Sequence, residues 1–394
     1  MLGKKISTDE RKIEELLTRG VEEVIDKDHL RGRLLKGEQL RVKLGIDPTS
    51  PNIHIGRAML LWRLRQFQDL GHRVVFIVGD FTGQIGDTSD KESERPMLSE
   101  EEVKKNMKTY FEQAYKILDR QNIETRYNSE WLKKLGFLEI GRMADRFGLH
   151  EITARELIKK RLDSGRRVSF RESLYPLMQG YDSVAVKADV ELGGTDQRFN
   201  LLAGRVIQPL YGQNPQDIVI MKFPLLGLDG RKMSSSWGNV INITDEPNDM
   251  FGKVMSISDD LIIHYFDMAT QVSADGIRGV EEDIKKGKNP RDAKLRLAGE
   301  IVKRYHGPDA AQKAKDEWER VFSKGELPSE MEEVEGGKLI DVVESSVGVS
   351  STQAKRLVDD GAVKINEEVV KEWSRQVNKG DTVQIGPKKF VKIK

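Results

Sequence analysis

The segment from residue 39 to residue 80 constrains the fold most, because it alternates two apolar strands with one amphipathic helix. The stretches QLRVKLGID (39–47) and HRVVFIVGD (72–80) are both typical of buried strands. Between them, IHIGRAMLLWRLRQFQDLG (53–71) has helical periodicity and closes on Gly71. This order predicts a βαβ unit.

The same alternation continues along the first half of the chain. We expect a helix over about 99–119, a short strand near 123–129, helical structure over about 152–187 and a strand within 217–227. Strands that alternate with helices predict an α/β fold with a Rossmann-type, doubly wound parallel sheet. Such sheets bind ligands beyond the carboxyl ends of their strands. We assign residues 1–244 to this domain.

The second half changes character twice. Residues 245–324 have a mostly helical pattern and are expected to form a helical domain. Residues 325–337 collect Pro, Gly and Glu without apolar periodicity, which predicts a linker. Residues 338–394 have a helical pattern followed by short alternating runs, which predict a small α+β domain.

Composition excludes several classes of function. The absence of cysteine excludes disulfides, cysteine-based zinc sites and a thiol nucleophile. The chain has 65 Lys and Arg against 64 Asp and Glu, so nucleic-acid binding would have to come from local basic patches. The N-terminal stretch lacks the apolar core of a secretory signal, and no run approaches the ~18 apolar residues of a membrane span. We therefore expect a soluble, cytoplasmic protein.

The stretch GIDPTSPNIHIGRAML carries the first candidate site. Asp47 and Thr49 follow the first predicted strand, and His54, Gly56 and Arg57 open the next helix. The unpaired N–H groups and the dipole of a helix N-terminus favour an anion, and both His54 and Arg57 can donate to phosphate oxygens. A glycine there lets a flat ring lie against the backbone. An ordinary capped helix with a solvated histidine is the alternative interpretation.

The stretch GLDGRKMSSSWGN (227–239) carries the second. It is a glycine-bearing turn followed by Arg231, Lys232 and three serines, of which Ser234 is the first. A mobile loop with so many donors can close over a polyphosphate, although many surface loops have a similar composition. The two stretches, about 180 residues apart on an α/β pattern, are together far more specific than either alone.

HIGR (54–57) and KMSSS (232–236) resemble HIGH and KMSKS, the two signature motifs of class I aminoacyl-tRNA synthetases. Nearly the whole chain resembles the bacterial tyrosyl-tRNA synthetases, with the amino-acid-specific part in FTGQIGD (81–87), YPLMQGYD (175–182) and GGTDQ (193–197). The resemblance implies that tyrosine is activated with ATP and transferred to tRNA(Tyr). It also implies Mg²⁺ on the pyrophosphate and no metal site made by the protein alone.

The resemblance assigns roles to individual residues. Those implied at the nucleotide, including the catalytic positions of the first motif, are His54, Arg57, Thr49, Asp47, Gly56, Gly194 and Asp196. Two further residues, Lys232 and Ser234, are implied to contact the pyrophosphate as it leaves, and Lys232 is also implied to bind ATP.

Five residues are implied at the tyrosine substrate. Asp87, Tyr175 and Gln179 would hold its α-ammonium group, Asp182 would accept its phenol proton, and Gln197 would contact its carboxylate region. The residue types fit, because an ammonium group needs a carboxylate and neutral acceptors. In a helix, Tyr175, Gln179 and Asp182 fall at i, i+4 and i+7 on one face. A half-buried amphipathic face with Tyr175 in the core is the alternative.

The chain departs from the family pattern at three positions. Arg57 stands where the first motif usually ends in His, and Ser235 replaces the second Lys of the loop motif. Lys43 occupies a position where some family members have a Tyr that contacts the substrate phenol. The second partner of that phenol is therefore left open.

The C-terminal stretch SSTQAKRLVDDGAVKINEEVV (350–370) resembles a small RNA-binding fold named after a small-subunit ribosomal protein. Residues 338–394 hold 11 Lys and Arg against 8 Asp and Glu, a modest excess of positive charge. The expected phosphate contacts are Lys355, Arg356, Lys388, Lys389, Lys392 and Lys394. A docking domain with a solvated charged face is the alternative.

The family resemblance also implies that residues 245–324 bind the tRNA anticodon and that the chain forms a homodimer through about 126–172. Two other functions stay open. A tryptophanyl-tRNA synthetase shares the fold and both motifs, but would not be expected to carry Gln179 and Asp182 arranged for a phenol. A non-catalytic RNA-binding relative would keep the fold without the reaction.

Overall fold

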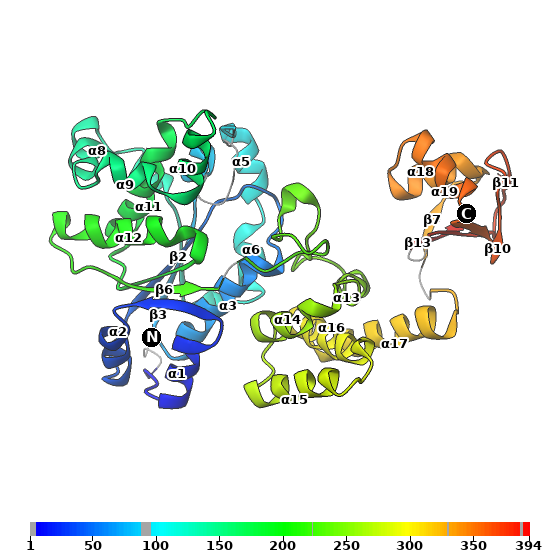
Figure 1. Ribbon diagram of the computed structural model, residues 1–394, viewed down its shortest axis with the longest axis horizontal. Coiled ribbons are helices and arrows are strands. Elements are labelled where there is room, and N and C mark those ends of the chain that lie inside the picture. Colours follow the sequence, from blue (N-terminus) through cyan, green and yellow to red (C-terminus); the bar gives the residue numbers. More distant parts are fainter. Residues whose placement is uncertain (1–4, 88–95, 223, 329–330, 387–388) are drawn as a thin grey trace. The chain divides into compact units, whose positions relative to one another are not determined.

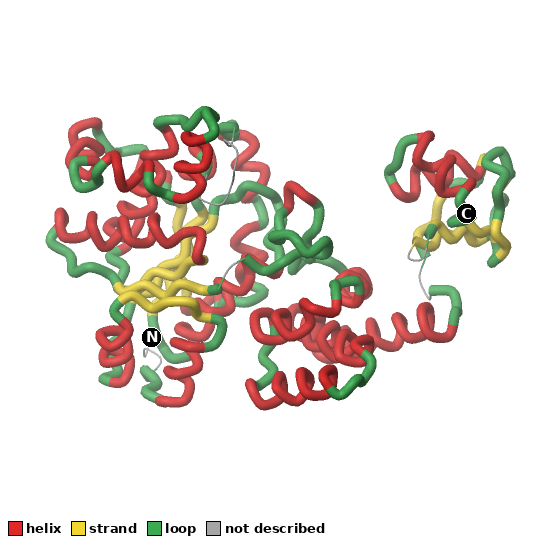
Figure 2. Tube along the Cα trace, in the orientation of Figure 1, coloured by secondary structure: helices red, strands yellow, loops and turns green. Residues whose placement is uncertain are grey.

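The computed structural model describes residues 5–87, 96–222, 224–328, 331–386 and 389–394. The chain divides into two compact units, Met1–Ala311 and Gln312–Lys394. Figure 1 traces the chain through both units, and Figure 2 shows the strands of each unit together with its helices.

The first unit is built on a six-stranded sheet, which confirms the predicted α/β fold. Its strand order is β1-β6-β5-β2-β3-β4, and all neighbouring strands are parallel except the edge pair β1 and β6. The strand bounds are β1 Val21–Ile25, β2 Arg41–Ile46, β3 Arg73–Val78, β4 Ile123–Tyr127, β5 Val190–Gly194 and β6 Asp217–Met221. The sequence did not predict β1 or β5. An antiparallel edge strand on an otherwise parallel sheet is common in such folds.

Helices cover both faces of this sheet. In Figure 1, α1 (Glu10–Thr18), α2 (Lys27–Leu35) and α3 (Ile55–Asp69) lie on one side of it, and α11 (Arg171–Val186) and α12 (Arg198–Ile207) lie on the other. The helix α3 connects β2 to β3, and α12 connects β5 to β6. The chain thus winds outward in both directions from β2 and β5, as a doubly wound sheet requires.

Two predicted helices are broken into shorter pieces. The helix expected over 99–119 ends at Met107 and restarts at Tyr110, because the backbone of Thr109 (φ −113°, ψ 6°) is not helical. The helical stretch expected over 152–187 is interrupted after Asp163, where Gly165 adopts a positive φ of 68°. The helices between β3 and α11 are α4 Thr82–Ile85, α5 Glu100–Met107, α6 Tyr110–Tyr115, α7 Ser129–Leu132, α8 Phe137–Ala144, α9 Leu149–Thr153 and α10 Glu156–Asp163.

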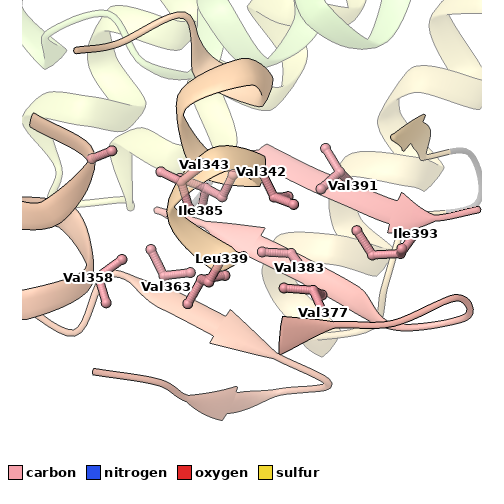
Figure 3. Packing of buried hydrophobic residues seen from close by; sticks show 11 residues of the cluster. Leu339, Val342, Val343, Val358, Val363, Val377, Val383, Ile385, Val391 and Ile393 are labelled. Carbon is pink, nitrogen blue, oxygen red and sulfur yellow. The ribbon is translucent and has the colours of Figure 1, made fainter. Parts of the chain in front are cut away.

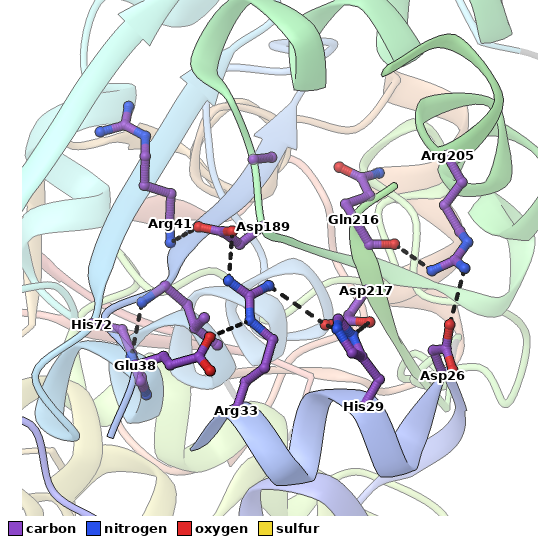
Figure 4. Close-up of polar contacts among 12 residues, drawn as sticks. Asp26, His29, Arg33, Glu38, Arg41, His72, Asp189, Arg205, Gln216 and Asp217 are labelled. Atoms are coloured by element: carbon purple, nitrogen blue, oxygen red, sulfur yellow. Dashed lines mark hydrogen bonds and ion pairs between the residues drawn. The ribbon is translucent and has the colours of Figure 1, made fainter. Parts of the chain in front are cut away.

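A polar cluster ties α2 to the amino ends of β2, β5 and β6 (Figure 4). The Arg33 guanidinium donates to Glu38 and Asp189, each at 2.8 Å. The second carboxylate oxygen of Asp189 accepts from the backbone N–H of Arg41 at 2.8 Å, and His29 lies 2.9 Å from the buried carboxylate of Asp217. These contacts lie at the end of the sheet opposite the carboxyl ends of its strands.

The helical region that follows is composed of α13 Pro247–Met255, α14 Ile262–Ala269, α15 Ala274–Lys285, α16 Pro290–His306 and α17 Pro308–Lys324. Polar contacts attach it to α1 and α3. Arg19 donates to the carbonyls of Phe266 and Thr270 at the end of α14, and Trp62 donates to the Tyr305 hydroxyl at 3.3 Å. Arginine side chains at helix C-termini satisfy carbonyls that the helix itself leaves open.

The second unit is a small α+β domain, as predicted. Its five-stranded sheet has the order β10-β9-β12-β13-β7, and β8 pairs with β11 in a second sheet. The element bounds are β7 Glu332–Val334, β8 Gly337–Lys338, α18 Leu339–Val347, α19 Ser351–Asp359, β9 Val363–Ile365, β10 Glu368–Val369, β11 Gln376–Val377, β12 Thr382–Ile385 and β13 Lys389–Ile393. Strand β7 lies inside the predicted linker 325–337, so that prediction was wrong at its C-terminal end. The acidic composition hid a strand that pairs through its backbone with β13.

The core of this domain is made of aliphatic side chains from α18 and the sheet, which meet in Figure 3. Leu339 and Val343 from α18 are fully buried, as are Val383 and Val391 from β12 and β13. This layer is what holds the helices on the strands.

Truncation of this core should destabilise the second unit specifically. We expect Leu339→Ala to lower its free energy of unfolding by roughly 2–5 kcal/mol, because the change removes buried methyl groups and leaves a cavity. Amide hydrogen exchange of residues 338–394 in the full chain, measured against urea concentration, would report this. Val369→Ala, at a site that is 51% exposed, is the matched control. An equally small effect of both variants would contradict the packing described above.

Candidate active site

The predicted site residues come together at the centre of the sheet. There β2 has β5 on one side and β3 on the other, and the connections from the carboxyl ends of β2 and β5 leave in opposite directions. A cavity opens at this switch point. The predicted residues that line it are Asp47, Thr49, His54, Arg57, Asp87, Tyr175, Gln179, Asp182, Gly194, Asp196, Gln197, Lys232 and Ser234.

Gly56 is the one predicted nucleotide residue that is not among those lining this cavity. It is buried in the first turn of α3, and a Cβ atom on it would lie 3.0 Å from Nδ1 of His54. The glycine therefore leaves room for the imidazole ring.

His54 is buried and neutral at the start of α3. Only 4% of the residue is exposed, and its Nδ1 accepts from the backbone N–H of Arg57 at 3.4 Å. Burial, reinforced by the charges of Arg57 and Lys232, lowers the pKa of the imidazole to about 3. Because Nδ1 is an acceptor, the single proton belongs on Nε2, which is then a donor. The alternative of a solvated histidine is therefore wrong, although the residue does cap the helix.

Arg57 contacts the loop that follows β2. Its guanidinium donates to the Thr49 hydroxyl at 2.9 Å, to the Asp47 carbonyl at 3.2 Å and to the Tyr110 hydroxyl at 3.3 Å. A histidine has only two ring nitrogens and could not donate to three such partners. The arginine thus fixes the loop while lining the cavity.

The carboxylate of Asp47 joins the two halves of the site. It accepts from the Thr82 hydroxyl at 2.7 Å and from the Tyr175 hydroxyl at 2.9 Å. Burial, and then the neighbouring charge of Asp47, hold the pKa of Tyr175 well above its ordinary value, so this hydroxyl stays a donor. Gly79 makes the approach possible, because a Cβ there would lie 2.1 Å from Asp47 Oδ1 and 2.3 Å from Thr82 Oγ1. Sequence reasoning missed Thr82 and Gly79.

Asp182 lies deep in the cavity and is 4% exposed. Its two carboxylate oxygens accept from Trp131 Nε1 at 2.7 Å and from Asn128 Nδ2 at 3.2 Å. Burial raises the pKa of this carboxyl to about 7, opposed by the charge of Lys43 and by the two donors. Asn128 and Trp131 were also missed. Asn128 directly follows β4, and polar residues at the carboxyl end of a strand are the signal that could have found it.

The helical face predicted from YPLMQGYD is present. Residues 175–182 lie within α11, and Tyr175, Gln179 and Asp182 all line the same cavity. Beside them, Gln197 Nε2 donates to Asp87 Oδ2 at 2.7 Å. One helix and the turn after β5 thus enclose one end of the cavity.

The loop carrying KMSSS closes the other end. Lys232 Nζ lies 3.3 Å from the Asp196 carboxylate. The buried side chain of Asn239, a residue that sequence reasoning missed, accepts from the Ser234 backbone N–H at 2.8 Å and donates to Asp229 and to the Lys232 carbonyl. Asn239 therefore fixes the turn that presents the serines.

The loop that precedes the first motif touches the second motif. The Ser50 hydroxyl, in the loop after β2, donates to the Ser235 hydroxyl at 3.1 Å. Arg231 pairs instead with Asp229 and stacks over the Trp237 ring at 4.7 Å, and it is not among the residues lining the cavity. Lys232 and Arg57 are the two basic side chains at this end of the cavity that come from the motifs.

The predicted RNA contacts lie in the second unit. Lys355 and Arg356 are exposed on α19, and Lys355 lies 4.8 Å from the centre of the Trp373 ring. Lys389 and Lys394 pair with Glu332 and Glu335, while Lys392 is exposed. Lys388 lies outside the described residues.

Within the described ranges, no three His, Asp or Glu side chains are arranged so that they could hold a metal ion. No helix of the described part of the chain is long and apolar enough to cross a membrane.

Comparisons with known proteins identify the family. Residues 35–323 match the model for tRNA synthetases class I (W and Y), and residues 339–383 match the S4 domain. A tyrosine–tRNA ligase of Carboxydothermus hydrogenoformans is 46% identical over 96% of this chain and 97% of its own length. One from Haemophilus influenzae is 45% identical over 96% of each chain.

Solved structures agree in fold. A C-terminally truncated mitochondrial tyrosyl-tRNA synthetase of Aspergillus nidulans has a TM-score of 0.65 at 23% identity, covering 79% of this chain and 94% of its own. The tyrosyl-tRNA synthetase of Archaeoglobus fulgidus, solved with L-tyrosine, has a TM-score of 0.62 at 23% identity, covering 78% and 99%. Because this identity of about 45% extends over nearly the full length of both chains, the chain belongs to the tyrosine–tRNA ligase family of class I synthetases.

Proposed function

We propose that the chain activates tyrosine with ATP and then esterifies the terminal ribose of tRNA(Tyr). The observation that carries the substrate choice is Asp182, a buried carboxylate at the end of a cavity formed by the signature motifs. A carboxylate held by two donors accepts from a phenol hydroxyl, which phenylalanine lacks. An indole N–H also donates to a carboxylate, so the choice of tyrosine over tryptophan is supported by the identity to tyrosine–tRNA ligases.

The proposed reaction needs no protein nucleophile. The tyrosine carboxylate attacks the α-phosphorus of ATP while the bond to the departing pyrophosphate breaks. A ribose hydroxyl of tRNA then attacks the acyl carbon, loses its proton and releases AMP. The contribution of the protein is to align the reactants and to stabilise charge that develops on the phosphates.

At the nucleotide end, the proposed roles follow from the chemistry of the side chains. His54 donates from Nε2 as a neutral group, and Lys232 and Ser234 contact the pyrophosphate as it leaves. Thr49, Gly194 and Asp196 are proposed contacts to the nucleotide, with Asp47 beside them. Mg²⁺ is proposed to arrive with ATP on the phosphate oxygens, where oxygen ligands suit it.

At the tyrosine end, Asp182 is proposed to accept from the phenol. Asp87, Tyr175 and Gln179 hold the α-ammonium group, and Gln197 contacts the carboxylate region. Tyr175 reaches an ammonium through its oxygen lone pairs, because its proton is directed to Asp47.

The remaining parts are proposed to serve tRNA. The catalytic domain is 1–244, the helical domain 245–324 binds the anticodon, and the domain 338–394 binds RNA phosphates through Lys355, Arg356 and the terminal lysines. Because ATP and tRNA are its substrates, the enzyme is proposed to act in the cytoplasm.

A homodimer is proposed from an exposed apolar surface. Large hydrophobic side chains are rarely exposed together unless they bind a partner. Within the predicted interface 126–172, the exposed ones are Phe137 (94%), Leu138 (72%), Leu149 (69%), Leu162 (45%) and Phe170 (77%). A second copy of the chain offers the same surface, as a two-fold interface requires.

The function is tested by exchange of pyrophosphate into ATP, measured with each amino acid in turn. Tyrosine should support exchange and tryptophan should not.

Since the pKa of Asp182 is raised to about 7, kcat/KM for tyrosine should fall as the pH falls below about 7 and the carboxylate gains a proton. Asp182→Ala should remove this dependence and cost tyrosine at least about tenfold, but phenylalanine much less. An unchanged tyrosine-to-phenylalanine ratio would remove Asp182 from the pocket.

The proposed role of the loop can be tested separately. Lys232→Ala should slow tyrosine activation by roughly 10²-fold or more, as does removal of one preorganised donor from a developing charge. Pre-steady-state adenylate formation would measure it. Arg231→Ala is the matched control, because that neighbouring cation pairs with Asp229 outside the cavity. Normal activation in Lys232→Ala would make KMSSS a surface turn.

The dimer is tested by sedimentation. Phe137→Asp should convert a dimer into monomers, because it buries a charge against the partner. Val369→Asp, at an exposed apolar site of the second unit, should leave the assembly unchanged. A wild-type chain that sediments as a monomer would contradict the proposal.

A further inference from the structure

A buried ion pair lies beneath the tyrosine end of the cavity. Lys43 of β2 and Glu191 of β5 are paired neighbours across the two strands, and their charged atoms are 2.9 Å apart. The two residues are 0% and 1% exposed, yet both line the cavity. Such a pair is costly unless its remaining hydrogen-bonding positions are satisfied.

All three protons of the Lys43 ammonium group have partners. They point to Glu191 Oε1, to the backbone carbonyl of Gln179 and to the Ser183 hydroxyl, each at 2.9 Å. An ammonium group has three donors and no acceptor. Lys43 therefore has no proton left for the phenol of a substrate, which answers the question raised by the lysine at this position.

The carboxylate of Glu191 is surrounded by donors. Besides Lys43, it accepts from Gln179 Nε2 and from the Ser183 hydroxyl, each at 3.1 Å, and from Gln216 Nε2. An ionised carboxylate can only accept. The side-chain amide of Gln179 must therefore turn its NH₂ group toward Glu191. This leaves the side-chain oxygen, Oε1, for the cavity.

We propose that Lys43 and Glu191 are positioning residues for the α-ammonium group of the substrate. The ion pair fixes the Gln179 amide with its oxygen, the atom that an ammonium group needs, facing the ligand. Lys43 supplies the opposite charge that the buried carboxylate requires, and it also anchors the Gln179 backbone. This inference rests on the proposed function, since it takes tyrosine as the ligand.

The test removes both charges at once. Lys43→Met/Glu191→Met replaces the pair by apolar side chains of similar length, a change that folded proteins often tolerate. This variant removes Glu191, which is the acceptor that orients the Gln179 amide. Glu191→Gln is a second, more conservative variant, in which residue 191 can donate as well as accept. The matched control is Asp217→Asn, which changes an equally buried carboxylate at the start of the neighbouring strand β6; Asp217 contacts His29 and does not line the cavity (Figure 4).

Three ligands separate the roles. Tyrosine and tyramine carry the ammonium group, and 3-(4-hydroxyphenyl)propionate carries the phenol and carboxylate without it. Equilibrium dialysis with the full chain should show both amine ligands bound at least about tenfold more weakly by the double variant, as expected for a lost hydrogen bond to a charge. Glu191→Gln should shift them in the same direction. The propionate should bind all four proteins within about threefold.

Each other outcome is decisive. Equal weakening of all three ligands would mean that the pocket had lost its shape, and it would overturn the inference. Unchanged binding of tyramine in both variants would overturn it as well. Should the double variant fail to fold, Glu191→Gln decides alone. A wild-type chain that binds tyrosine but supports no exchange would overturn the proposed function. The binding of the three ligands would then still decide whether Lys43 and Glu191 position the ammonium group.

Discussion

The parallel pairing of β2 with β5 is the constraint on which the site depends. These two strands are adjacent in the sheet but far apart in the sequence, and the chain leaves their carboxyl ends toward opposite edges. The space between the diverging connections is the cavity, so side chains just beyond the carboxyl ends of these strands can face it. Asp47 after β2 and Asp196 after β5 lie in it for that reason.

Burial then decides the protonation state of the groups in that cavity. The same loss of water that makes His54 neutral also raises the pKa of Asp182 into the neutral range. One consequence is a donor without charge at the end of the cavity where the KMSSS loop lies. The other is a carboxylate that keeps its charge only with the help of Lys43, Trp131 and Asn128. The environment, rather than the residue type, determines what each group can do.

The sequence predicted most of the fold and most of the cavity, because both depend on local patterns. The strands β2, β3 and β6 have apolar runs, β4 (IETRY) has β-branched and aromatic residues typical of a strand, and both motifs are contiguous. By contrast, β5 reads VELGG, in which a charged residue and two glycines interrupt the apolar pattern. The contacts that explain Glu191 come from Lys43 and from donors on other segments. Contacts between distant segments have no local signature.

The missed residues follow the same rule. Asn239 matters because it holds the backbone of a turn, and Gly79 matters because Asp47 and Thr82 approach it. Neither residue belongs to a motif of its own. The helix break near Thr109 was missed because its backbone angles depend on packing that a periodic pattern does not report. The break at Gly165 had a local signal, a glycine that ends a helix, and it was overlooked.

The two departures from the signature motifs are connected through space. Arg57 adds a permanent charge to the first motif, and Ser235 removes one from the second, so the number of permanent charges equals that in HIGH and KMSKS. The two loops meet where Ser50 contacts Ser235, and Arg57 contacts Thr49 in the same turn. Position 235 is exposed, so a lysine there would have many rotamers to lose, whereas Arg57 is already held by three contacts. The exchange therefore moves positive charge from the loop to the start of α3, where less side-chain entropy is lost when an anion binds.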